Sequence, residues 1–316
     1  MEQRELGTTG IRVSRVILGC GNFGGIGSAP AFFEQGESKD ESFAIMDAAR
    51  AAGITTFDTA DAYGGGRSEA WIGEWLRARG IPRDEIVLST KVFNPMDEGL
   101  EGGLAPDRVR RQLDSSLERL GVDRLDMYLT HDSDPETPLE DTLAVLDELV
   151  ADGKVRAVGG SNLDGELLRA GLGTYRWVQN SYSLLDRGPE REVLPFCAEH
   201  GLGFTPFSPL AGGWLTGKYR RGETAPSGSR MATRPEPYLH LEDDRVFDGL
   251  DRLAAEAASQ GVDTATLALA WLLAQPQVTA VIVGPRRPEH LEPALRALDV
   301  ELSASEADEL GSLFPV

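Results

Sequence analysis

Apolar residues along the chain alternate between short β-branched runs and longer segments with helical spacing. Runs such as Ile54–Phe57 and Val155–Val158 are typical of buried strands, whereas Pro138–Ala151 carries leucine at positions 139, 143, 146 and 149, on one helical face. This alternation predicts eight strands. We expect them at Val16–Leu18, Ile54–Phe57, Ile86–Leu88, Leu125–Leu129, Val155–Val158, Trp177–Val178, Gly203–Thr205 and Thr279–Val283.

Helical segments separate these strands, so the strands are expected to pair in parallel. Spread over about 280 residues without a visible linker, the pattern favours a single domain, 1–316, of the α/β class: a closed (β/α)8 TIM barrel. A doubly wound open sheet is the alternative. Arg4–Ser14 is expected to form a hairpin that caps the barrel, and extra helices are expected near the C-terminus. The helices are expected at Asp40–Ala52, Ser68–Arg79, Pro106–Leu120, Pro138–Ala151, Asp164–Gly171, Pro189–His200, Asp244–Ser259, Thr264–Ala274 and Pro288–Leu298.

Composition argues against several kinds of binding partner. The 316 residues include 51 Asp and Glu against 31 Lys and Arg, a net charge of -20, which argues against partners such as nucleic acid or an anionic membrane. Two cysteines and widely spaced histidines give no metal-ligand spacing, so we expect no metal. The polar start, Met1–Gly10, and the lack of a long apolar run predict a cytoplasmic protein without a signal peptide.

Two glycine motifs suggest nucleotide binding but lack the expected context. Gly19–Gly24 matches G-x-G-x-x-G, yet it continues into a glycine- and proline-containing loop rather than a helix. Gly212–Lys218 matches the start of a P-loop, but Tyr219 occupies the position where Ser or Thr would hold magnesium. We therefore expect neither a Rossmann motif nor an ATP site, although the second segment can still bind phosphate through backbone N–H groups.

Polar side chains follow three successive predicted strands. Asp58 ends the second strand with Tyr63 just beyond, Lys91 follows the third, and His131 follows the fourth. Barrel enzymes work at these strand ends, so the four residues are expected to converge at one mouth. A simpler interpretation is that Asp58 and Lys91 form only a buried structural ion pair.

The four residues suit proton transfer to an oxygen that gains negative charge. A tyrosine has a pKa near 10, and a nearby ammonium is expected to lower the pKa of Tyr63. A carboxylate keeps that lysine charged, and a neutral histidine can orient a substrate oxygen. This is half of a carbonyl reduction, and the other half is a hydride from a nicotinamide.

A series of distinctive stretches lies in order along the chain: Gly53–Tyr63 followed by Ser68 and Glu69, Ser89–Val92, Asp126–His131, Asp152–Arg156, Ser161–Asn162, Val178–Arg187 and Phe207–Lys218. These stretches resemble the aldo-keto reductase family, in particular its branch of potassium-channel β-subunits. The similarity runs from Arg4 to about Leu310, nearly the whole chain. It implies a (β/α)8 barrel that binds NADPH across its mouth, with Tyr63 as the acid.

The resemblance also implies cofactor contacts along the strand-end loops. Its expected nicotinamide contacts are Gly21, Asn22, Asp58, Ser161, Asn162 and Gln179, with Phe207 stacking on the ring. Its expected phosphate contacts are Ser208, Leu210, Gly212 and Lys218, with Arg286 at the 2′-phosphate and His290 nearby.

The sequence departs from the family pattern in several places. Phe207 replaces the more usual Tyr or Trp, and Gly160 replaces an apolar residue. Pro293 and Ala294 replace residues that often meet the adenine, and His290 suits either a cofactor contact or a helix surface. Phe23 and Phe93 are the expected substrate contacts, although each can equally pack structurally.

Three functions remain open at this point. The first is NADPH-dependent reduction of a small aldehyde or ketone, reversibly, to an alcohol. The alternative is an NADP(H)-binding regulatory protein with little turnover, because fold alone does not settle function. The third is a lyase with Lys91 as a Schiff-base amine, which a protonated Lys91 disfavours. Nothing in the sequence specifies the carbonyl substrate or an oligomeric partner.

Overall fold

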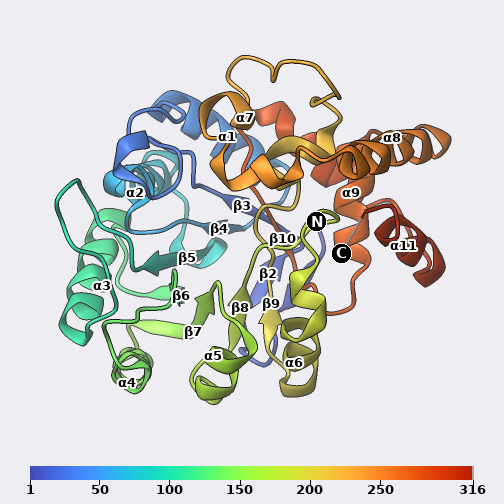
Figure 1. Ribbon diagram of the computed structural model, residues 1–316. Helices are drawn as coiled ribbons and strands as arrows, with labels where there is room; N and C mark the ends of the chain where they lie inside the picture. The colour runs from blue at the N-terminus through green and yellow to red at the C-terminus, as the bar shows by residue number, and fades with distance from the viewer. Residues whose placement is uncertain (315–316) are drawn as a thin grey trace.

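Eight parallel strands form the centre of the computed structural model, which describes residues 1–314. Figure 1 shows them surrounded by helices α1 to α6 and α9. Their order, β10-β3-β4-β5-β6-β7-β8-β9, follows the chain except that β10 pairs with β3. The strands are β3 (Val16–Gly19), β4 (Thr56–Asp58), β5 (Val87–Val92), β6 (Leu125–Thr130), β7 (Val155–Ser161), β8 (Trp177–Gln179), β9 (Gly203–Phe204) and β10 (Val281–Val283).

Backbone hydrogen bonds join the two ends of this sheet. The N–H of Thr279 donates to the carbonyl of Phe204 over 2.8 Å, and the N–H of Ile282 donates to that of Pro206 over 3.0 Å. The segment after β9 is thus bonded to β10, and the sheet closes on itself. The prediction of a (β/α)8 TIM barrel is confirmed, and the doubly wound alternative is wrong.

An antiparallel hairpin of β1 (Gln3–Glu5) and β2 (Arg12–Ser14) caps the barrel, as the sequence predicts. Leu6, Ile11 and Val13 pack with barrel residues such as Met127 and Trp177 in one buried cluster. The turn residue Gly7 has φ +54, and a Cβ there would lie 2.4 Å from the Gly203 nitrogen, so only glycine allows this close approach. The apolar end of the barrel is therefore filled, and the opposite end holds the polar strand termini.

The helices bury their apolar faces against the outside of the barrel. α9 is apolar nearly all round and is almost completely buried, whereas α1 begins with a Ser38–Glu41 capping box on a half-exposed helix. The helices are α1 (Lys39–Ala51), α2 (Arg67–Arg79), α3 (Pro106–Leu120), α4 (Leu139–Ala151), α5 (Gly165–Ala170), α6 (Val193–His200), α7 (Arg230–Thr233), α8 (Asp244–Ser259), α9 (Thr264–Ala274), α10 (Glu292–Ala297) and α11 (Ala304–Gly311).

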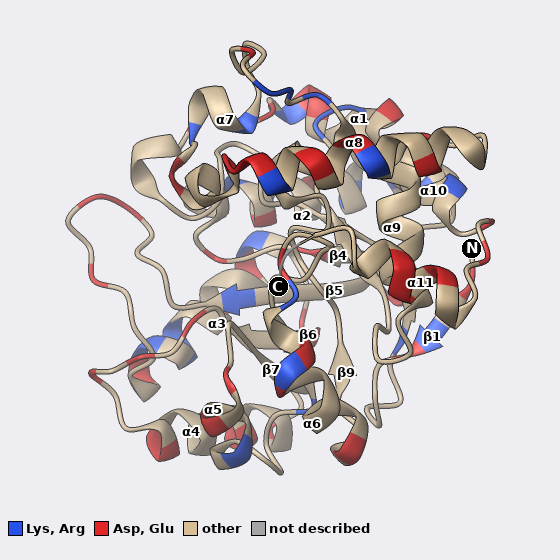
Figure 2. Cartoon of the chain, turned by 45° about the vertical axis from the view of Figure 1, so that its right-hand side comes forward, with Lys and Arg blue, Asp and Glu red and all other residues tan. Residues whose placement is uncertain are grey.

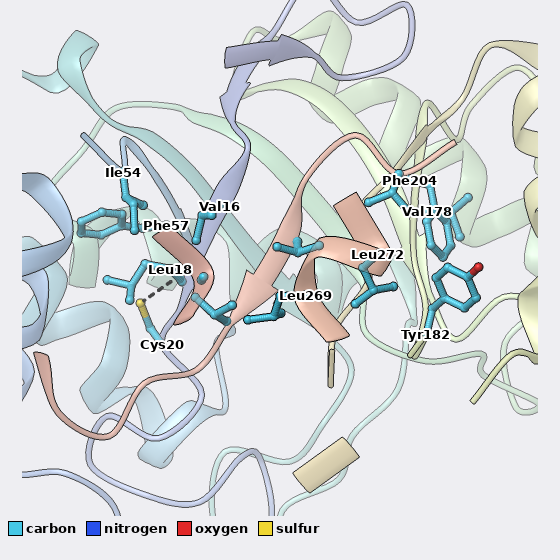
Figure 3. Close-up of a cluster of buried hydrophobic side chains, with 14 of the residues drawn as sticks. Val16, Leu18, Cys20, Ile54, Phe57, Val178, Tyr182, Phe204, Leu269 and Leu272 are labelled. Atoms are coloured by element: carbon cyan, nitrogen blue, oxygen red, sulfur yellow. Dashed lines mark hydrogen bonds between the residues drawn. The ribbon is translucent and has the colours of Figure 1, made fainter. Parts of the chain in front are cut away.

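The main hydrophobic core lies between the strands and these helices. Figure 3 shows part of it, with Val16 and Leu18 of β3 near Phe57 of β4, and Leu269 and Leu272 of α9 nearby. Acidic residues recur along the outer helices α8 and α11, where the cartoon in Figure 2 is coloured red. α11 is the expected extra C-terminal helix, and the carbonyl of its Ala307 accepts a 2.9 Å hydrogen bond from the Trp271 indole.

Some predicted boundaries differ from the structure for identifiable reasons. β5 runs on to Val92, so Lys91 belongs to the strand itself and is held by its ladder with β6. The expected helix Pro288–Leu298 is split into a 3₁₀ turn, Pro288–Leu291, and α10, and the expected helix Pro189–His200 is interrupted at Glu192, whose φ of −144 is not helical.

Neither glycine motif has the strand–turn–helix structure of a Rossmann motif or a P-loop. Gly19–Gly24 leaves β3 into a loop, and α1 begins only at Lys39. Gly212–Gly217 lies at a kinked 3₁₀ turn, Ala211–Thr216. Among residues 1–314, no helix is long and apolar enough to cross a membrane.

Candidate active site

Asp58 and Lys91 form an ion pair at the polar end of the barrel. The Lys91 ammonium lies 2.6 Å from Asp58 Oδ2 and also donates to the Thr59 carbonyl over 2.8 Å. Adjacent strands carry the two residues, because β4 and β5 pair Asp58 with Ser89. Both side chains are almost completely buried, so the pair is shielded from water.

Two neutral donors hold the other oxygen of Asp58. Ser89 Oγ lies 2.9 Å and Gln179 Nε2 lies 3.0 Å from Asp58 Oδ1. Gln179 ends β8 and therefore reaches the carboxylate from another part of the barrel. With these three donors, Lys91 included, both oxygens of the buried Asp58 side chain are hydrogen-bonded and its position is fixed.

Tyr63 lies above this pair, in the turn that follows β4. Its hydroxyl oxygen accepts from the Lys91 ammonium over 3.4 Å. Burial raises the pKa of Tyr63, the Lys91 charge lowers it, and the Asp58 charge raises it. The net effect is a raised pKa, with burial as the largest cause. The expected lowered pKa is therefore wrong for this structure, because desolvation of the phenolate exceeds the attraction of the ammonium.

His131 directly follows β6 and faces Tyr63. The two rings meet edge to face, with centroids 5.5 Å apart and planes at 76°. Burial, followed by the nearby Lys91 charge, lowers the pKa of His131 well below its ordinary value, so the ring is neutral at pH 7. The Asn94 amide lies 3.1 Å from Nδ1, and if it donates there the other ring nitrogen, Nε2, carries the proton.

The four residues differ in exposure in a way that suits proton transfer. Asp58 and Lys91 are buried, whereas Tyr63 and His131 are each partly exposed at the mouth. Burial lowers the pKa of Lys91, but Asp58 and Tyr63 together raise it above its usual value. Lys91 is therefore an ammonium, which disfavours the Schiff-base hypothesis.

The residues expected to hold the nicotinamide end lie around the same mouth. Ser161 ends β7 and is buried, and the exposed Asn162 donates to the His131 carbonyl over 2.9 Å. A Cβ on Gly160 would lie 2.6 Å from Leu163 Cδ1, so an apolar residue at this position would require the Leu163 side chain to shift.

Backbone strain is concentrated at these strand ends. Asn162, Ser208 and Ala211 have φ of +57, +53 and +46, values that residues with side chains rarely adopt. Each of them follows a barrel strand in a segment expected to contact the cofactor. Such strain often accompanies binding sites, where it orients backbone groups toward a ligand.

The remaining expected cofactor residues lie on the loops after β9 and β10. Phe207, Leu210 and Gly212 are partly exposed, and Lys218 is exposed. His290 lies close to Lys218, Arg286 and Arg287. Burial lowers the pKa of His290, Glu289 raises it, and the three cations lower it further. The cations expected to meet phosphates are therefore grouped around His290.

Two residues near these cations, Glu37 and Arg230, are not among the contacts expected from the sequence. Arg286 lies 2.6 Å from Glu37 Oε1 and donates to the Gly228 carbonyl over 2.7 Å. Arg230 of α7 donates to Asn22 over 3.3 Å. No local pattern marks Glu37 or Arg230 as site residues; the only signal is their place in two unusually long strand-end loops, 21–37 and 220–244.

The two expected substrate contacts differ in accessibility. Phe23 is completely buried and packs in the main core, so its side chain is not exposed at the mouth. Phe93 follows β5 and is partly exposed. Gly21 lies against Tyr63, because a Cβ on Gly21 would lie 3.5 Å from the tyrosine ring. Among residues 1–314, no group of three or more His, Cys, Asp or Glu side chains is placed to hold a metal.

Comparison with known proteins agrees with this geometry. The sequence model of the Aldo/keto reductase family matches residues 15–314. An uncharacterized oxidoreductase of Bacillus subtilis is 36% identical, over 100% of this chain and 96% of the relative. An NADH-specific methylglyoxal reductase of Escherichia coli is 35% identical, over 97% and 96% respectively. A probable voltage-gated potassium channel subunit beta of rice is 33% identical, over 95% and 92%. The chain belongs to the aldo/keto reductase family.

Proposed function

We propose that this oxidoreductase reduces a small aldehyde or ketone to an alcohol, reversibly, with NADPH as the hydride donor and Tyr63 as the proton donor. The observation that carries the proposal is the Lys91 ammonium, 2.6 Å from Asp58 and 3.4 Å from the Tyr63 hydroxyl. A buried, permanently charged group directly behind a partly exposed hydroxyl serves to stabilise that hydroxyl after it loses its proton.

The chain's own residues divide the work at the carbonyl oxygen. Tyr63 donates its proton to that oxygen, and His131 donates a hydrogen bond that fixes its position. Lys91 stabilises the phenolate that Tyr63 becomes, and Asp58 keeps Lys91 charged and in place. When bound, the nicotinamide supplies the hydride to the carbonyl carbon.

The donor set at the mouth fits a nicotinamide dinucleotide. Polar groups of Ser161, Asn162 and Gln179 suit a carboxamide, and the partly exposed Phe207 offers a ring face. Lys218 and Arg286 are exposed cations in an acidic chain, which suits phosphates. The proposed contacts are those expected from the sequence: Gly21, Asn22, Asp58, Ser161, Asn162, Gln179, Phe207, Ser208, Leu210, Gly212, Lys218, Arg286 and His290.

Replacing Tyr63 by Phe tests the assignment of the proton donor. We expect Tyr63→Phe to lower kcat by about 10²- to 10⁴-fold, the usual contribution of a general acid. The measurement is the loss of absorbance of reduced nicotinamide with a panel of aldehydes and ketones. Tyr128→Phe is the matched control, because it removes a buried hydroxyl that faces the Val109 carbonyl on α3. Normal turnover by Tyr63→Phe would refute the role of Tyr63.

A regulatory function is the second candidate, favoured by the relatives named as potassium channel subunits beta in rice and Arabidopsis. It predicts tight binding of the dinucleotide with no turnover of any carbonyl in the panel, together with a protein that co-purifies. Single-turnover mixing of the NADPH complex with each carbonyl separates the two candidates, because only the enzyme oxidises its cofactor.

We also propose that the protein works in the cytoplasm on a small-molecule carbonyl, without nucleic acid or membrane partners. The net charge of -20 supports the absence of polyanionic partners. Cys20 and Cys197 are free and buried, as is usual in a reducing compartment. For the substrate, Phe93 is the better-exposed contact, while a role for Phe23 requires its side chain to leave the core.

A further inference from the structure

A buried glutamate lies within the cationic part of the mouth. The Glu37 side chain is 4% exposed, and its Oε1 is 2.6 Å from Arg286 Nε. Its other oxygen, Oε2, is buried and has no hydrogen-bond partner among the described residues. Burial raises the pKa of Glu37 despite the neighbouring Arg286, which shows that the pairing compensates only part of the desolvation.

Glu37 also restricts what Arg286 can bind. Two guanidinium nitrogens of Arg286 are already used, one by Glu37 and one by the Gly228 carbonyl. The loop that contains Glu37 is anchored by the bridge between Phe23 and Glu37, so the carboxylate is part of an ordered segment. Only Nη2 of Arg286 has no hydrogen-bond partner among the described residues, so an added anion would share the guanidinium with the carboxylate.

We propose that Glu37 sets the preference between NADPH and NADH by competing with the 2′-phosphate for Arg286. The inference rests on the proposed function, in which Arg286 meets the 2′ position of the cofactor. A phosphate must either displace the carboxylate from Arg286 or lie beside it, and both arrangements are unfavourable. A 2′-hydroxyl carries no charge, so it neither competes with the carboxylate for Arg286 nor is repelled by it. Glu37 thus weakens NADPH relative to NADH.

The test measures Kd for NADPH and NADH separately, by calorimetry or by quenching of protein fluorescence, without any carbonyl present. Glu37→Gln keeps the shape and an acceptor for Arg286 but removes the charge. We expect it to raise the ratio of the NADH Kd to the NADPH Kd about tenfold, mainly through tighter NADPH. Glu34→Gln is the matched control: it removes the same charge from the same loop, but Glu34 pairs with Arg67. We expect the control to change the ratio less than twofold.

A double variant separates competition from simple repulsion. In an Arg286→Ala background, Glu37→Gln should change the ratio less than threefold, because no guanidinium remains to compete for. A change below threefold for Glu37→Gln alone, an equal change for Glu34→Gln, or a full change without Arg286 would each overturn the inference. If Glu37→Gln does not fold, Glu37→Ala gives the same expected direction. Failure of the wild-type protein to bind either dinucleotide would instead refute the proposed function.

Discussion

The mouth of the barrel has two polar regions that are built differently. The tetrad consists of Asp58, Tyr63, Lys91 and His131, and its ion pair joins two adjacent strands beneath the surface. The rim consists of Glu37, Arg230, Arg286 and the Gly228 carbonyl, which come from three loops; Glu37 and Arg286 are 249 residues apart in sequence. The ion pair of the tetrad is held by the sheet, whereas the rim holds loops together.

Under the proposed function, this difference separates the groups that carry out the chemistry from those that select the cofactor. Groups that transfer protons must be positioned within a fraction of an ångström, which rigid strands achieve. Groups that discriminate between ligands act through charge, which loops can vary at small cost in stability. Removing one partner of a buried pair typically costs about 3–5 kcal/mol, whereas an exposed ion pair contributes about 0–1 kcal/mol. Both partners of the tetrad pair are buried, whereas the rim pair joins the buried Glu37 to the half-exposed Arg286 and lies between these limits. We therefore expect changes in the tetrad to affect both stability and turnover.

Lys91→Met gives the largest expected effect. It preserves the length of the side chain but removes the ammonium, leaving the Asp58 carboxylate buried with only Ser89 and Gln179 as donors. We expect kcat to fall by at least about 10³-fold, as for loss of a group that stabilises charge in the transition state. The free energy of unfolding, measured in urea, should fall by about 3–5 kcal/mol.

The double variant Lys91→Met with Asp58→Asn separates the two losses. It removes the unpaired charge, so stability should largely return while turnover stays absent. If Lys91→Met instead lost less than about 1 kcal/mol of stability, the tetrad would be no more tightly held than an exposed ion pair, and the contrast with the rim would fail.

Asp61 provides a second test, because it is a buried carboxylate without the donors that hold Asp58. Neither of its oxygens has a hydrogen-bond partner among the described residues, and burial, reinforced by Glu69, raises its pKa to about 8. In the unfolded chain an aspartate has a pKa of about 3.9. The folded state therefore binds an extra proton between these values, so this group's contribution to stability is lost as pH rises from about 4 to about 8.

Asp61→Asn should remove this pH dependence. We expect the variant to exceed the wild type in free energy of unfolding at pH 8 by an amount on the order of a few kcal/mol, with the gap shrinking toward pH 5. Urea unfolding at a series of pH values measures the gap. Asp123→Asn, at an exposed loop position, is the control and should give no such trend. A constant gap across this range would show that Asp61 is already ionised in the folded protein.

The fold was predictable because its signals are local and repeated. Short apolar runs alternate with helical segments, and closure follows once eight such units are present. The boundaries were less predictable, because register with a neighbour decides where a strand ends. Pairing with β6 extends β5 through Lys91, a polar residue that a sequence pattern places outside the strand.

The candidate site also has features that could be predicted from the sequence and features that could not. The convergence of the four tetrad side chains could be predicted because each lies at or within a few residues of the end of a barrel strand, so that sequence position determines spatial position. The raised pKa of Tyr63 could not be predicted from the sequence, because it depends on how deeply the hydroxyl is buried. Glu37 and Arg230 could not be found either, since their partners lie on loops more than 200 residues away, whose conformation no local pattern specifies.

Arg286→Ala gives the smallest expected effect and tests the rim directly. It removes a half-exposed cation at the proposed 2′-phosphate position and leaves Glu37 without its partner. We expect the Kd for NADPH to rise by about 10- to 100-fold, the value of one charge-assisted interaction, while the Kd for NADH changes only a few-fold. Because Arg286 contacts none of the tetrad residues, kcat with saturating cofactor should stay near the wild-type value. Arg287→Ala, an exposed neighbour without a hydrogen bond to Glu37, is the control. Equal losses for the two dinucleotides would refute the 2′-phosphate role, and a collapse of kcat at saturation would show that rim and tetrad are not separable.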